Sequence, residues 1–563
     1  MENFYIRLLR DFSDGLLATQ YHGNDPRLSG GFLCPACKMM HGRSPDAVYP
    51  LLYLAKVSGE EKYLTAARAV FAFGENFLCR DGGMYNDAQN TWRFTTVFHA
   101  VSVGDALRTG AGWLDDETQA ALLDRFRRMA DFLFRNLDEH TYANINYPTT
   151  GAAALAMAGH LLGKEEYLGK AAHLAAYAMA HITENGFLFG EGKPHDALSP
   201  LGCRAIDVGY NMEESLPSLV RYAREVGDEG MLSRLSDILR RQLVLMLPDG
   251  AWDNSFGCRN NKWTYYGSRT SDGCATAYLL LADRDPAFAA AARRNTELLA
   301  ACTHGGLLYG GPHYRAAGVP PCVHHTFEHA CALAYVAEHA APAALAAAVG
   351  GIPADHPAPF AYYPEVNTYR VAAGDYTATV TGYDHEVKPG CHASGGTLTL
   401  LHHRGRGAMI AASVVDYRMA EPFNMQQPLD IAAHRSLVPR LVTERAGVSY
   451  TTAYFTRPEM GGGAEADGVM VWAKTGLADS AARPLADLHP DITYCLRADG
   501  LHLTIRGAAG CRFVLPLIAG QATLLAGRKI AGEPIFFLTP GFRALETVYE
   551  PDGAGVIALH IHA

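Results

Sequence analysis

The sequence of 563 residues lacks an uncharged apolar run long enough for a membrane helix, so we expect no membrane as a partner. It also lacks a basic surplus: its net charge of −10 argues against a nucleic acid as a partner. The first residues, MENFYIRLLRDFSDGLL, lack the basic and then apolar segments of a secretory signal. We therefore expect a cytoplasmic protein, or a secreted or periplasmic one from which a signal peptide has been removed.

Regular cysteine pairing is absent as well. The 12 cysteines are scattered along the chain, which favours reduced thiols over a disulfide scaffold. Cys34 and Cys37 form a Cys-x-x-Cys pair, which is either redox-active or half of a zinc site. Because no second Cys-x-x-Cys pair follows, the sequence does not favour zinc at this place.

The N-terminal part of the chain contains a repeat of paired apolar helices. Each unit has a helix end, an acidic turn, a second amphipathic helix and a glycine that we expect to end it. Four units share the same spacing, with their marker residues at Gly59 and Gly82, Gly163 and Gly186, Gly227 and Gly250, and Ala282 and Gly305. Such hairpins must stack to bury their apolar faces, and their irregular succession favours a closed ring over an open solenoid. We predict an α/α toroid of helical hairpins over residues 1–355, with its loops gathered at one mouth.

The residue pattern changes in the remainder of the chain. Short β-branched segments such as TYRVAAGDYTATVTGYD, GVMVWAKT and GVIALHIHA are bounded by Gly, Asp or Pro. This pattern is typical of an antiparallel β-sandwich, which we predict for residues 356–563. The expected fold class is therefore a multidomain α + β protein.

One polar stretch, NNKWTYYGSRTSDGC at 260–274, interrupts the apolar helices. Burying so many charged groups in a helical core would be costly, so we expect the stretch at the mouth of the toroid. There, aromatic rings would stack on sugar rings and guanidinium groups would bind carboxylates or sulfates. The alternative is a polar loop closed by an Arg–Asp pair. The candidate substrate-binding residues of this region are Arg259, Asn261, Lys262, Trp263, Tyr265 and Arg269.

Two helix starts carry further candidates. The stretch ANINYPTTG offers Asn146 and Tyr147, although Asn is also a common capping or turn residue. The stretch DVGYNMEES offers Tyr210 and Glu213, although a carboxylate in a first helical turn needs no function to explain it. A tyrosine needs cationic neighbours before it can act as a base.

Two more candidates lie close to glycines. His392 stands in the turn CHASGG before a strand of the predicted sandwich, where the glycines permit close approach of a ligand. His41 and Arg43, in the segment HGR, lead into the first hairpin and are placed to join the mouth.

This arrangement resembles the heparinase II/III superfamily of polysaccharide lyases. Asn146 and Tyr147 resemble the pair that neutralises the uronate carboxylate, and YNMEES resembles the segment that supplies the catalytic tyrosine. Tyr210 is our candidate for that tyrosine, with Tyr265 and Tyr314 as rivals. The stretch CHASGGTLTLL resembles the HxHxDxL stretch of the family, with His392 at its first histidine.

The resemblance implies no required cofactor and allows a structural divalent metal, Zn, Mn or Ca. Ser394 replaces the second histidine of the family stretch, so the metal set of the family is incomplete here. Asp416 and His434 are the remaining candidates for metal ligands in the sandwich.

The reaction that the resemblance implies is β-elimination on an anionic polysaccharide or oligosaccharide. Asn146, assisted by an arginine of 259–269, would neutralise the uronate carboxylate while the C5 proton leaves and the C4–O bond breaks. Tyr210 or His392 would take the proton. The expected substrate is a glycosaminoglycan such as hyaluronan, chondroitin or heparan, cut to 4,5-unsaturated products.

Three alternatives stay open at this point. One is a lyase acting on another uronate polymer, such as alginate or glucuronan. Another is an α/α-toroid glycoside hydrolase that uses two carboxylates, with candidates at Glu213, Glu214, Asp253 and Asp272. The third is a glycan-binding protein without activity, because a fold does not fix a function.

Overall fold

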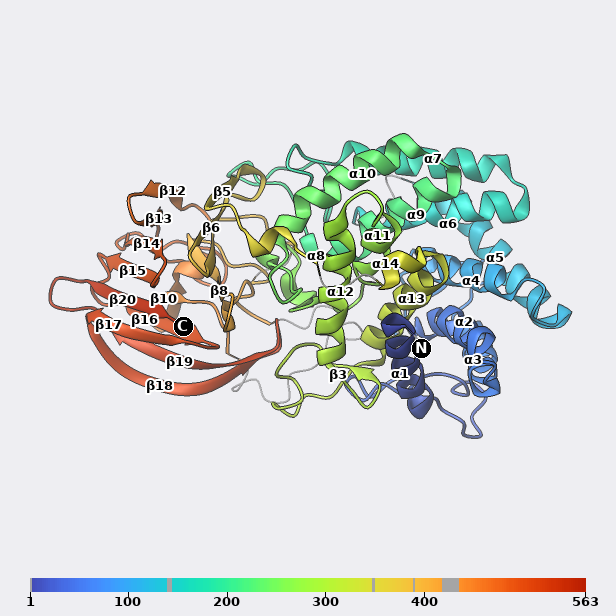
Figure 1. Ribbon diagram of the computed structural model, residues 1–563. Coiled ribbons are helices and arrows are strands. Elements are labelled where there is room, and N and C mark those ends of the chain that lie inside the picture. Colours follow the sequence, from blue (N-terminus) through green and yellow to red (C-terminus); the bar gives the residue numbers. More distant parts are fainter. Residues whose placement is uncertain (1–2, 139–143, 347–349, 388–389, 418–434) are drawn as a thin grey trace.

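The computed structural model describes residues 3–138, 144–346, 350–387, 390–417 and 435–563. Helices dominate up to Ala346 and strands from Phe360 onward, and the two kinds of element occupy opposite ends of the molecule in Figure 1. This architecture confirms the predicted fold class, an α/α toroid followed by an antiparallel β-sandwich. In the described part of the chain, no helix is both long and apolar enough to cross a membrane.

Six inner helices of the described chain contact one another in order around a ring, and the last contacts the first. They are α2 (Val48–Ser58), α4 (Thr96–Gly110), α6 (Asn146–Leu162), α9 (Leu216–Val226), α11 (Ala275–Leu280) and α13 (Val323–His339). Each pairs with an outer helix: in the same order, α3 (Glu61–Phe73), α5 (Asp116–Asn136), α7 (Glu165–Ala180), α10 (Glu229–Gln242), α12 (Pro286–Ala301) and α1 (Phe4–Thr19). Because α13 packs against α2, the toroid is closed.

The sequences of the helices explain their places. Helix α6, NYPTTGAAALAMAGHLL, is nearly uncharged and is buried on almost every face. Helix α5, DETQAALLDRFRRMADFLFRN, carries an apolar stripe and buries only that side. The nearly uncharged α6 therefore lies in the inner ring and the amphipathic α5 covers it, although the inner helix α9, LPSLVRYAREV, is also amphipathic.

The glycines of the repeat have two different roles. Gly59 and Gly163 end inner helices in the left-handed conformation, as predicted. The prediction that the second glycine ends the outer helix is wrong, because α3 ends at Phe73 and Gly82 lies in a later turn. A Cβ atom at Gly82, whose φ is 95°, would lie 2.0 Å from the carbonyl oxygen of Arg128 in α5. Gly82 thus lets its turn pack directly on α5, the next outer helix.

Three antiparallel sheets form most of the C-terminal region. The first contains β5 (Phe360–Tyr363), β6 (Thr368–Ala373), β7 (Tyr376–Thr381), β8 (Thr397–His403) and β9 (Gly407–Ala411), in this order. The second has the order β12 (Glu459–Glu465), β13 (Gly468–Lys474), β14 (Asp491–Arg497), β15 (Gly500–Arg506), β20 (Ile557–His562), β17 (Gln521–Ala526). The third has the order β11 (Val448–Thr451), β10 (Arg440–Arg445), β16 (Arg512–Leu517), β19 (Phe542–Glu550), β18 (Arg528–Phe537).

The sheets pack face to face around a shared apolar core. Strand β6 contacts β13 and β14, and one hydrophobic cluster contains residues of all three sheets. Along β14, buried and less buried side chains alternate, as expected for a strand with one face on a core. Two aromatic residues from the toroid, Trp263 and Tyr265, belong to this same cluster. The polar stretch identified in the sequence is therefore part of the contact between toroid and sandwich.

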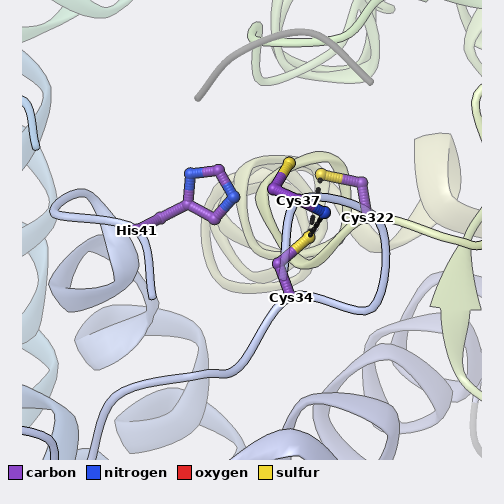
Figure 2. Close-up of side chains that lie close together, drawn as sticks. All are labelled: Cys34, Cys37, His41 and Cys322. Carbon is purple, nitrogen blue, oxygen red and sulfur yellow. Dashed lines mark hydrogen bonds between the residues drawn. The ribbon is translucent and has the colours of Figure 1, made fainter. Parts of the chain in front are cut away.

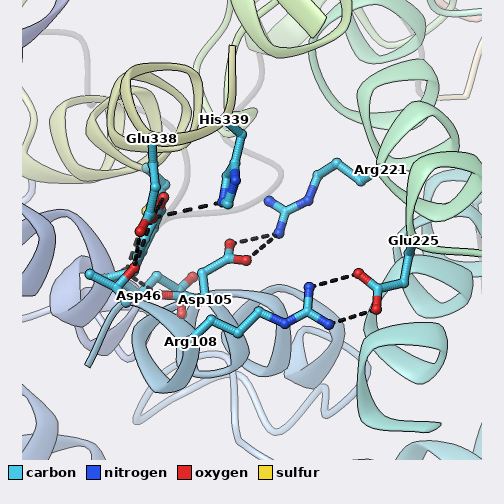
Figure 3. Close-up of polar contacts among 11 residues, drawn as sticks. Asp46, Asp105, Arg108, Arg221, Glu225, Glu338 and His339 are labelled. Carbon is cyan, nitrogen blue, oxygen red and sulfur yellow. Dashed lines mark hydrogen bonds and ion pairs between the residues drawn. The ribbon is translucent and has the colours of Figure 1, made fainter. Parts of the chain in front are cut away.

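The end of the toroid away from the sandwich is filled by paired charges, which Figure 3 shows. Arg221 of α9 donates two hydrogen bonds of 2.8 and 2.6 Å to Asp105 of α4. Arg108 binds Glu225 through two hydrogen bonds of 2.7 and 2.6 Å. Glu338 of α13 accepts hydrogen bonds from neighbouring hydroxyl groups. Since these residues lie toward the C-terminal ends of the inner helices, we call this network the far end of the toroid.

Candidate active site

A cavity of about 240 Å³ lies at the other end of the ring, where the loops before the inner helices meet. We call this place the mouth. Each contributing segment leads into an inner helix, so the positive ends of several helix dipoles point toward the same space. The lining residues are Arg43, Asn86, Asn90, Trp92, Thr95, Phe98, Asn144, Asn146, Tyr147, Tyr210, Glu214, Arg259, Lys262 and Thr270.

Tyr210 presents its hydroxyl group to this cavity between two cations. It ends the short helix α8 (Val208–Tyr210), and a π-helical turn at Asn211–Ser215 continues from it into α9. The Lys262 Nζ donates a hydrogen bond of 3.3 Å to Tyr210 Oη, and the Arg259 guanidinium lies 4.5 Å from the centre of the ring. The hydroxyl group also contacts Thr270 Oγ1. Tyr210 therefore has the cationic neighbours that a proton-transferring tyrosine requires.

Asn146, the first residue of α6, lines the same cavity as Tyr210. Its amide nitrogen donates a hydrogen bond to Glu214, and its amide oxygen has no hydrogen-bond partner in the described structure. Burial raises the pKa of Glu214 to about 8, against the opposing effect of the hydrogen bond from Asn146. Glu214 thus carries a proton at neutral pH and does not repel an anion that enters the cavity.

The other cations of the mouth are held by buried carboxylates. Arg43 lies 2.8 Å from Asp46 and 2.8 Å from Glu328, and Arg259 lies 2.7 Å from Glu191. These ion pairs fix the direction of both guanidinium groups. Together with Lys262, they give the lining three cationic side chains against the single carboxyl group of Glu214. An anionic ligand therefore suits the cavity.

Aromatic side chains form the outer wall. Tyr147, another predicted residue, lines the cavity, and its hydroxyl group accepts a hydrogen bond of 2.8 Å from Trp92 Nε1. The rings of Trp92 and Tyr147 meet edge to face at 5.7 Å, and Phe98 lies 6.0 Å from Tyr147. Such rings offer apolar faces to a sugar, with polar groups beside them.

The expectation that the aromatic residues of 260–274 stand exposed at the mouth is wrong. Trp263 and Tyr265 are 3% and 2% exposed and pack into the core of the sandwich. The Tyr265 hydroxyl group donates a hydrogen bond of 2.9 Å to Asp249, and its ring meets Phe542 edge to face at 4.8 Å. The large apolar area of these rings explains why they turn toward the sandwich core.

Arg269 and Tyr314 lie where the toroid contacts the sandwich, which we call the seam, and not in the cavity. Arg269 donates hydrogen bonds to the Tyr314 hydroxyl group at 2.7 Å and to the Leu538 carbonyl oxygen at 2.8 Å. The Tyr314 hydroxyl group donates to the same carbonyl oxygen at 2.6 Å. Among the three tyrosines considered from the sequence, Tyr210 lines the cavity, whereas Tyr265 and Tyr314 hold the seam.

Three further predicted residues lie outside the cavity lining. Glu213 is buried and accepts hydrogen bonds of 2.7 Å from the Ser268 amide and the Ser271 hydroxyl group, so it anchors the polar loop. His392 is buried, and its Nε2 lies 3.0 Å from the Ser255 carbonyl oxygen. Burial lowers the pKa of His392 to about 4. Asn261 is 6% exposed within the same loop.

The carboxylate pair of a glycoside hydrolase does not form in the described part of the cavity. Of the four candidates, only Glu214 lines it. Asp253 accepts a hydrogen bond of 2.5 Å from Thr379 in the sandwich, and Asp272 lies close to Glu328 behind the cavity. A hydrolytic mechanism with two carboxylates therefore lacks its second group at this place.

The sequence interpretation missed one wall of the cavity. Asn86, Asn90, Trp92 and Thr95 come from the loop before α4, in the stretch YNDAQNTWRFTT. This stretch has the same signal as the recognised ones, since polar and aromatic residues are concentrated between two apolar helices. It could have been identified by that criterion.

A structural metal has a compatible site in the described residues, although not where the resemblance suggested. Cys34, Cys37, His41 and Cys322 form a cluster that could hold an ion. His41, expected at the mouth, therefore belongs to this cluster. Of the two sandwich candidates, Asp416 is described, while His434 lies outside the described residues.

Comparison with known proteins assigns the chain to a family. Residues 9–350 match the family described as the ulvan lyase N-terminal domain, and residues 360–526 match the ulvan lyase C-terminal domain. The chain belongs to the ulvan lyase family. It is 40% identical over 466 residues to a broad-specificity ulvan lyase of Formosa agariphila, an alignment that covers 80% of this chain and 72% of the relative.

The solved structures agree on the fold. The chondroitin AC lyase of Streptomyces coelicolor, in complex with chondroitin sulphate, matches with a TM-score of 0.55 at 13% identity, over 100% of this chain and 80% of that one. The resemblance to polysaccharide lyases is thus confirmed: the chain is a polysaccharide lyase by its family, and it shares the fold of this solved lyase.

Proposed function

We propose that this lyase acts on ulvan, rather than on the glycosaminoglycans expected from the first resemblance. The proposal is supported by the match of both halves of the chain to ulvan lyase domains and by the activity named for the Formosa agariphila relative. Both kinds of polymer contain uronates, so the same elimination chemistry serves either one. The cationic lining of the cavity fits an anionic substrate of this kind.

The observation that carries the catalytic proposal is the position of the Tyr210 hydroxyl group. It lies in the cavity within 3.3 Å of Lys262 Nζ, and Asn146 lines the same space. We infer that the uronate carboxylate binds near Asn146, with its charge offset by Arg259 and Lys262. The protonated Glu214 adds a neutral hydrogen-bond donor rather than a competing charge.

The reaction then needs only one proton carrier. The Tyr210 phenolate takes the C5 proton, the C4–C5 double bond forms, and the C4–O bond breaks. Tyr210 returns the proton to the departing sugar oxygen, so atoms and charge balance and no water is consumed. Lys262 and Arg259 stabilise the negative charge on the phenolate and on the developing enolate-like carboxylate. In this proposal His392 supports the seam between toroid and sandwich instead of acting as the base.

A polymer panel tests the proposal. The protein is incubated with ulvan, chondroitin sulfate, heparan sulfate and alginate, and the ultraviolet absorbance of the conjugated unsaturated uronate is followed. We expect the fastest rise with ulvan, and a rise at least about 100-fold slower with the Tyr210→Phe variant. A faster rise with chondroitin or heparan sulfate would overturn the substrate assignment, and reducing ends without the chromophore would overturn the elimination.

We also propose a division of the chain close to residue 355. Helix α14 (Pro342–Ala346) precedes this point, and β5 follows it at Phe360. The two family matches also end and begin on either side of it, at residues 350 and 360. Because Arg269 and Trp263 are anchored in the sandwich, we expect the two parts to depend on each other for stability.

A further inference from the structure

Four potential metal ligands lie close together, as Figure 2 shows. Cys34, Cys37 and His41 come from the segment between α1 and α2, and Cys322 caps the N-terminus of α13. One sulfur or nitrogen atom from each residue lies within 4.8 Å of all the others. Cys34, Cys322 and His41 are at most 3% exposed. The cluster joins parts of the chain that are 288 residues apart, so tertiary folding alone creates it.

The spacing of the sulfur atoms fits a tetrahedral metal site. Cys34 Sγ and Cys322 Sγ lie 3.7 Å apart. Zn–S bonds of about 2.3 Å at the tetrahedral angle place two sulfur atoms about 3.8 Å apart. A disulfide would need an S–S distance of about 2.0 Å. The observed distance excludes a disulfide; it is that of an S–H···S hydrogen bond and also matches the edge of a zinc tetrahedron.

The backbone around Cys34 supports charge on its sulfur. The Cys37 amide donates a hydrogen bond of 3.4 Å to Cys34 Sγ. The turn is held by hydrogen bonds of 2.9 Å from the Lys38 amide to the Cys34 carbonyl and from the Cys34 amide to the Met39 carbonyl. Lys38 adopts the left-handed conformation, with φ at 60°, to complete this turn. An amide directed at sulfur stabilises a thiolate ligand and orients it toward a metal.

His41 supplies the second indication of a ligand. It is 1% exposed, and neither of its ring nitrogens has a hydrogen-bond partner of normal geometry among the described residues. A buried imidazole without such partners is costly, whereas a metal ion would satisfy one nitrogen directly. Its ring meets that of His324 edge to face at 5.3 Å, which holds it in place next to the thiols.

We propose that Cys34, Cys37, His41 and Cys322 bind one Zn²⁺ ion that fastens the N-terminal segment to the start of α13. Three thiolates and one imidazole are a closed tetrahedral ligand set of the kind found in structural zinc sites. Each cysteine thiol loses its proton when it binds, so three protons are released to solvent for each ion bound. With four protein ligands, the ion has no open position for substrate.

The site also has a consequence for the mouth, and this part rests on the proposed function. His41 stands two residues before Arg43, which lines the cavity. The Glu328 carboxylate that pairs with Arg43 at 2.8 Å belongs to α13, the helix that Cys322 begins. One ion therefore fixes both partners of this pair. The ligands are positioning residues for Arg43, and none of them lines the cavity.

The first test measures the metal itself. The full chain is purified under reducing conditions without added chelator, and its metal content is determined by mass spectrometry. We expect about one zinc ion per chain in the wild type, and at least a tenfold lower content in Cys322→Ser. Cys495→Ser, which alters a cysteine of the sandwich strand β14, is the matched control and retains the zinc.

Two further measurements keep the test decisive if the serine variant folds poorly. His41→Cys preserves four metal-binding side chains and is expected to retain the ion, whereas His41→Ala is expected to lose most of it. Replacement by Co²⁺ should give thiolate charge-transfer bands and the visible bands of tetrahedral cobalt. A reduced, folded wild type that contains no metal and takes up no cobalt would overturn the proposal. A Cys34–Cys322 or Cys34–Cys37 disulfide in the protein purified without reductant would overturn it as well.

The activity measurement separates this proposal from the lyase assignment. With the zinc-free His41→Ala variant, we expect a lower kcat on ulvan, and restoration in His41→Cys. A wild type that binds zinc but yields no unsaturated product from any polymer would refute the proposed function and leave the metal site intact.

Discussion

The two ends of the toroid differ in how their buried polar groups are arranged: one end is a closed network of ion pairs, and the other surrounds a cavity. At the far end, Arg221 and Arg108 each have a carboxylate partner bound by two hydrogen bonds, which join α4 and α9 (Figure 3). At the mouth, the Asn146 amide oxygen is buried without a partner among the described residues, and Tyr210 faces an open cavity. Buried polar groups are usually paired, so this unpaired atom beside an open cavity sets the mouth apart from the far end. The comparison teaches that charged side chains alone do not locate the site, because guanidinium–carboxylate pairs occur at both ends; the cavity at the mouth does.

The strongest test of this comparison is Tyr210→Phe. Loss of the only proposed proton carrier should lower kcat on ulvan by about 100- to 10,000-fold. The ring stays next to Arg259, so the melting temperature should change little. Rates follow from the absorbance of the unsaturated product, and stability from thermal unfolding. A nearly normal rate in this variant would show that Tyr210 is not the residue that transfers the proton.

At the far end, the matching change is Arg221→Met. It leaves Asp105 buried without its cation, and removing one partner of a buried pair costs about 3–5 kcal/mol of unfolding free energy. The kcat of the folded enzyme should remain unchanged, because the cavity lies at the other end. Urea unfolding measures the loss.

The double variant Arg221→Met with Asp105→Leu is the control for that change. It removes both charges, so most of the stability should return. If Arg221→Met instead abolishes activity at full stability, the division between a structural end and a catalytic end is wrong.

Asn146→Ala tests the mouth more mildly. Removing a donor to the developing carboxylate charge should lower kcat by about 100- to 1,000-fold. Asn76→Ala is the matched control, because Asn76 donates a hydrogen bond to the Phe73 carbonyl at the end of α3 and does not line the cavity, so kcat should remain unchanged. Equal effects of the two changes would count against a role of Asn146 in charge neutralisation.

Much of the fold follows from the sequence because its signals are local. The uncharged run of α6 predicts an inner helix and the apolar stripe of α5 an outer one, whereas the charged inner helix α9 does not follow this pattern. Alternation and turn residues likewise predict the strands. Asn146, Tyr210, Arg259 and Lys262 are recognisable because polar residues between apolar helices must lie in the loops at one end of the ring.

The remainder depends on contacts between distant segments. Within one loop, Lys262 turns toward the cavity while Trp263 turns into the sandwich, and only the packing of the sandwich decides this. Cys322 completes the cluster of Cys34 across 288 residues, so no local spacing could indicate it. Pairing of side chains from separate elements is a tertiary property, and periodicity does not contain it.

The smallest expected effect is on the pH dependence of stability and concerns Glu213, which is buried near the mouth but does not line the cavity. Burial raises the pKa of Glu213 to about 8 from its ordinary value of 4.5, despite the hydrogen bonds from Ser271 and Ser268. Between these values the folded protein holds a proton that the unfolded chain releases, so this group makes stability fall as pH rises toward 8.

Glu213→Gln removes that titration while its side-chain oxygen can still accept the same two hydrogen bonds. Between pH 6 and 8, the free energy of unfolding of the variant minus that of the wild type should increase with pH, by at most about 1.4 kcal/mol per pH unit. Glu117→Gln, on the exposed first turn of α5, is the control: its free energy of unfolding should change with pH as that of the wild type does. Parallel curves for Glu213→Gln as well would mean that Glu213 is ionised in the folded protein, and that buried carboxyl groups near the mouth do not keep their protons.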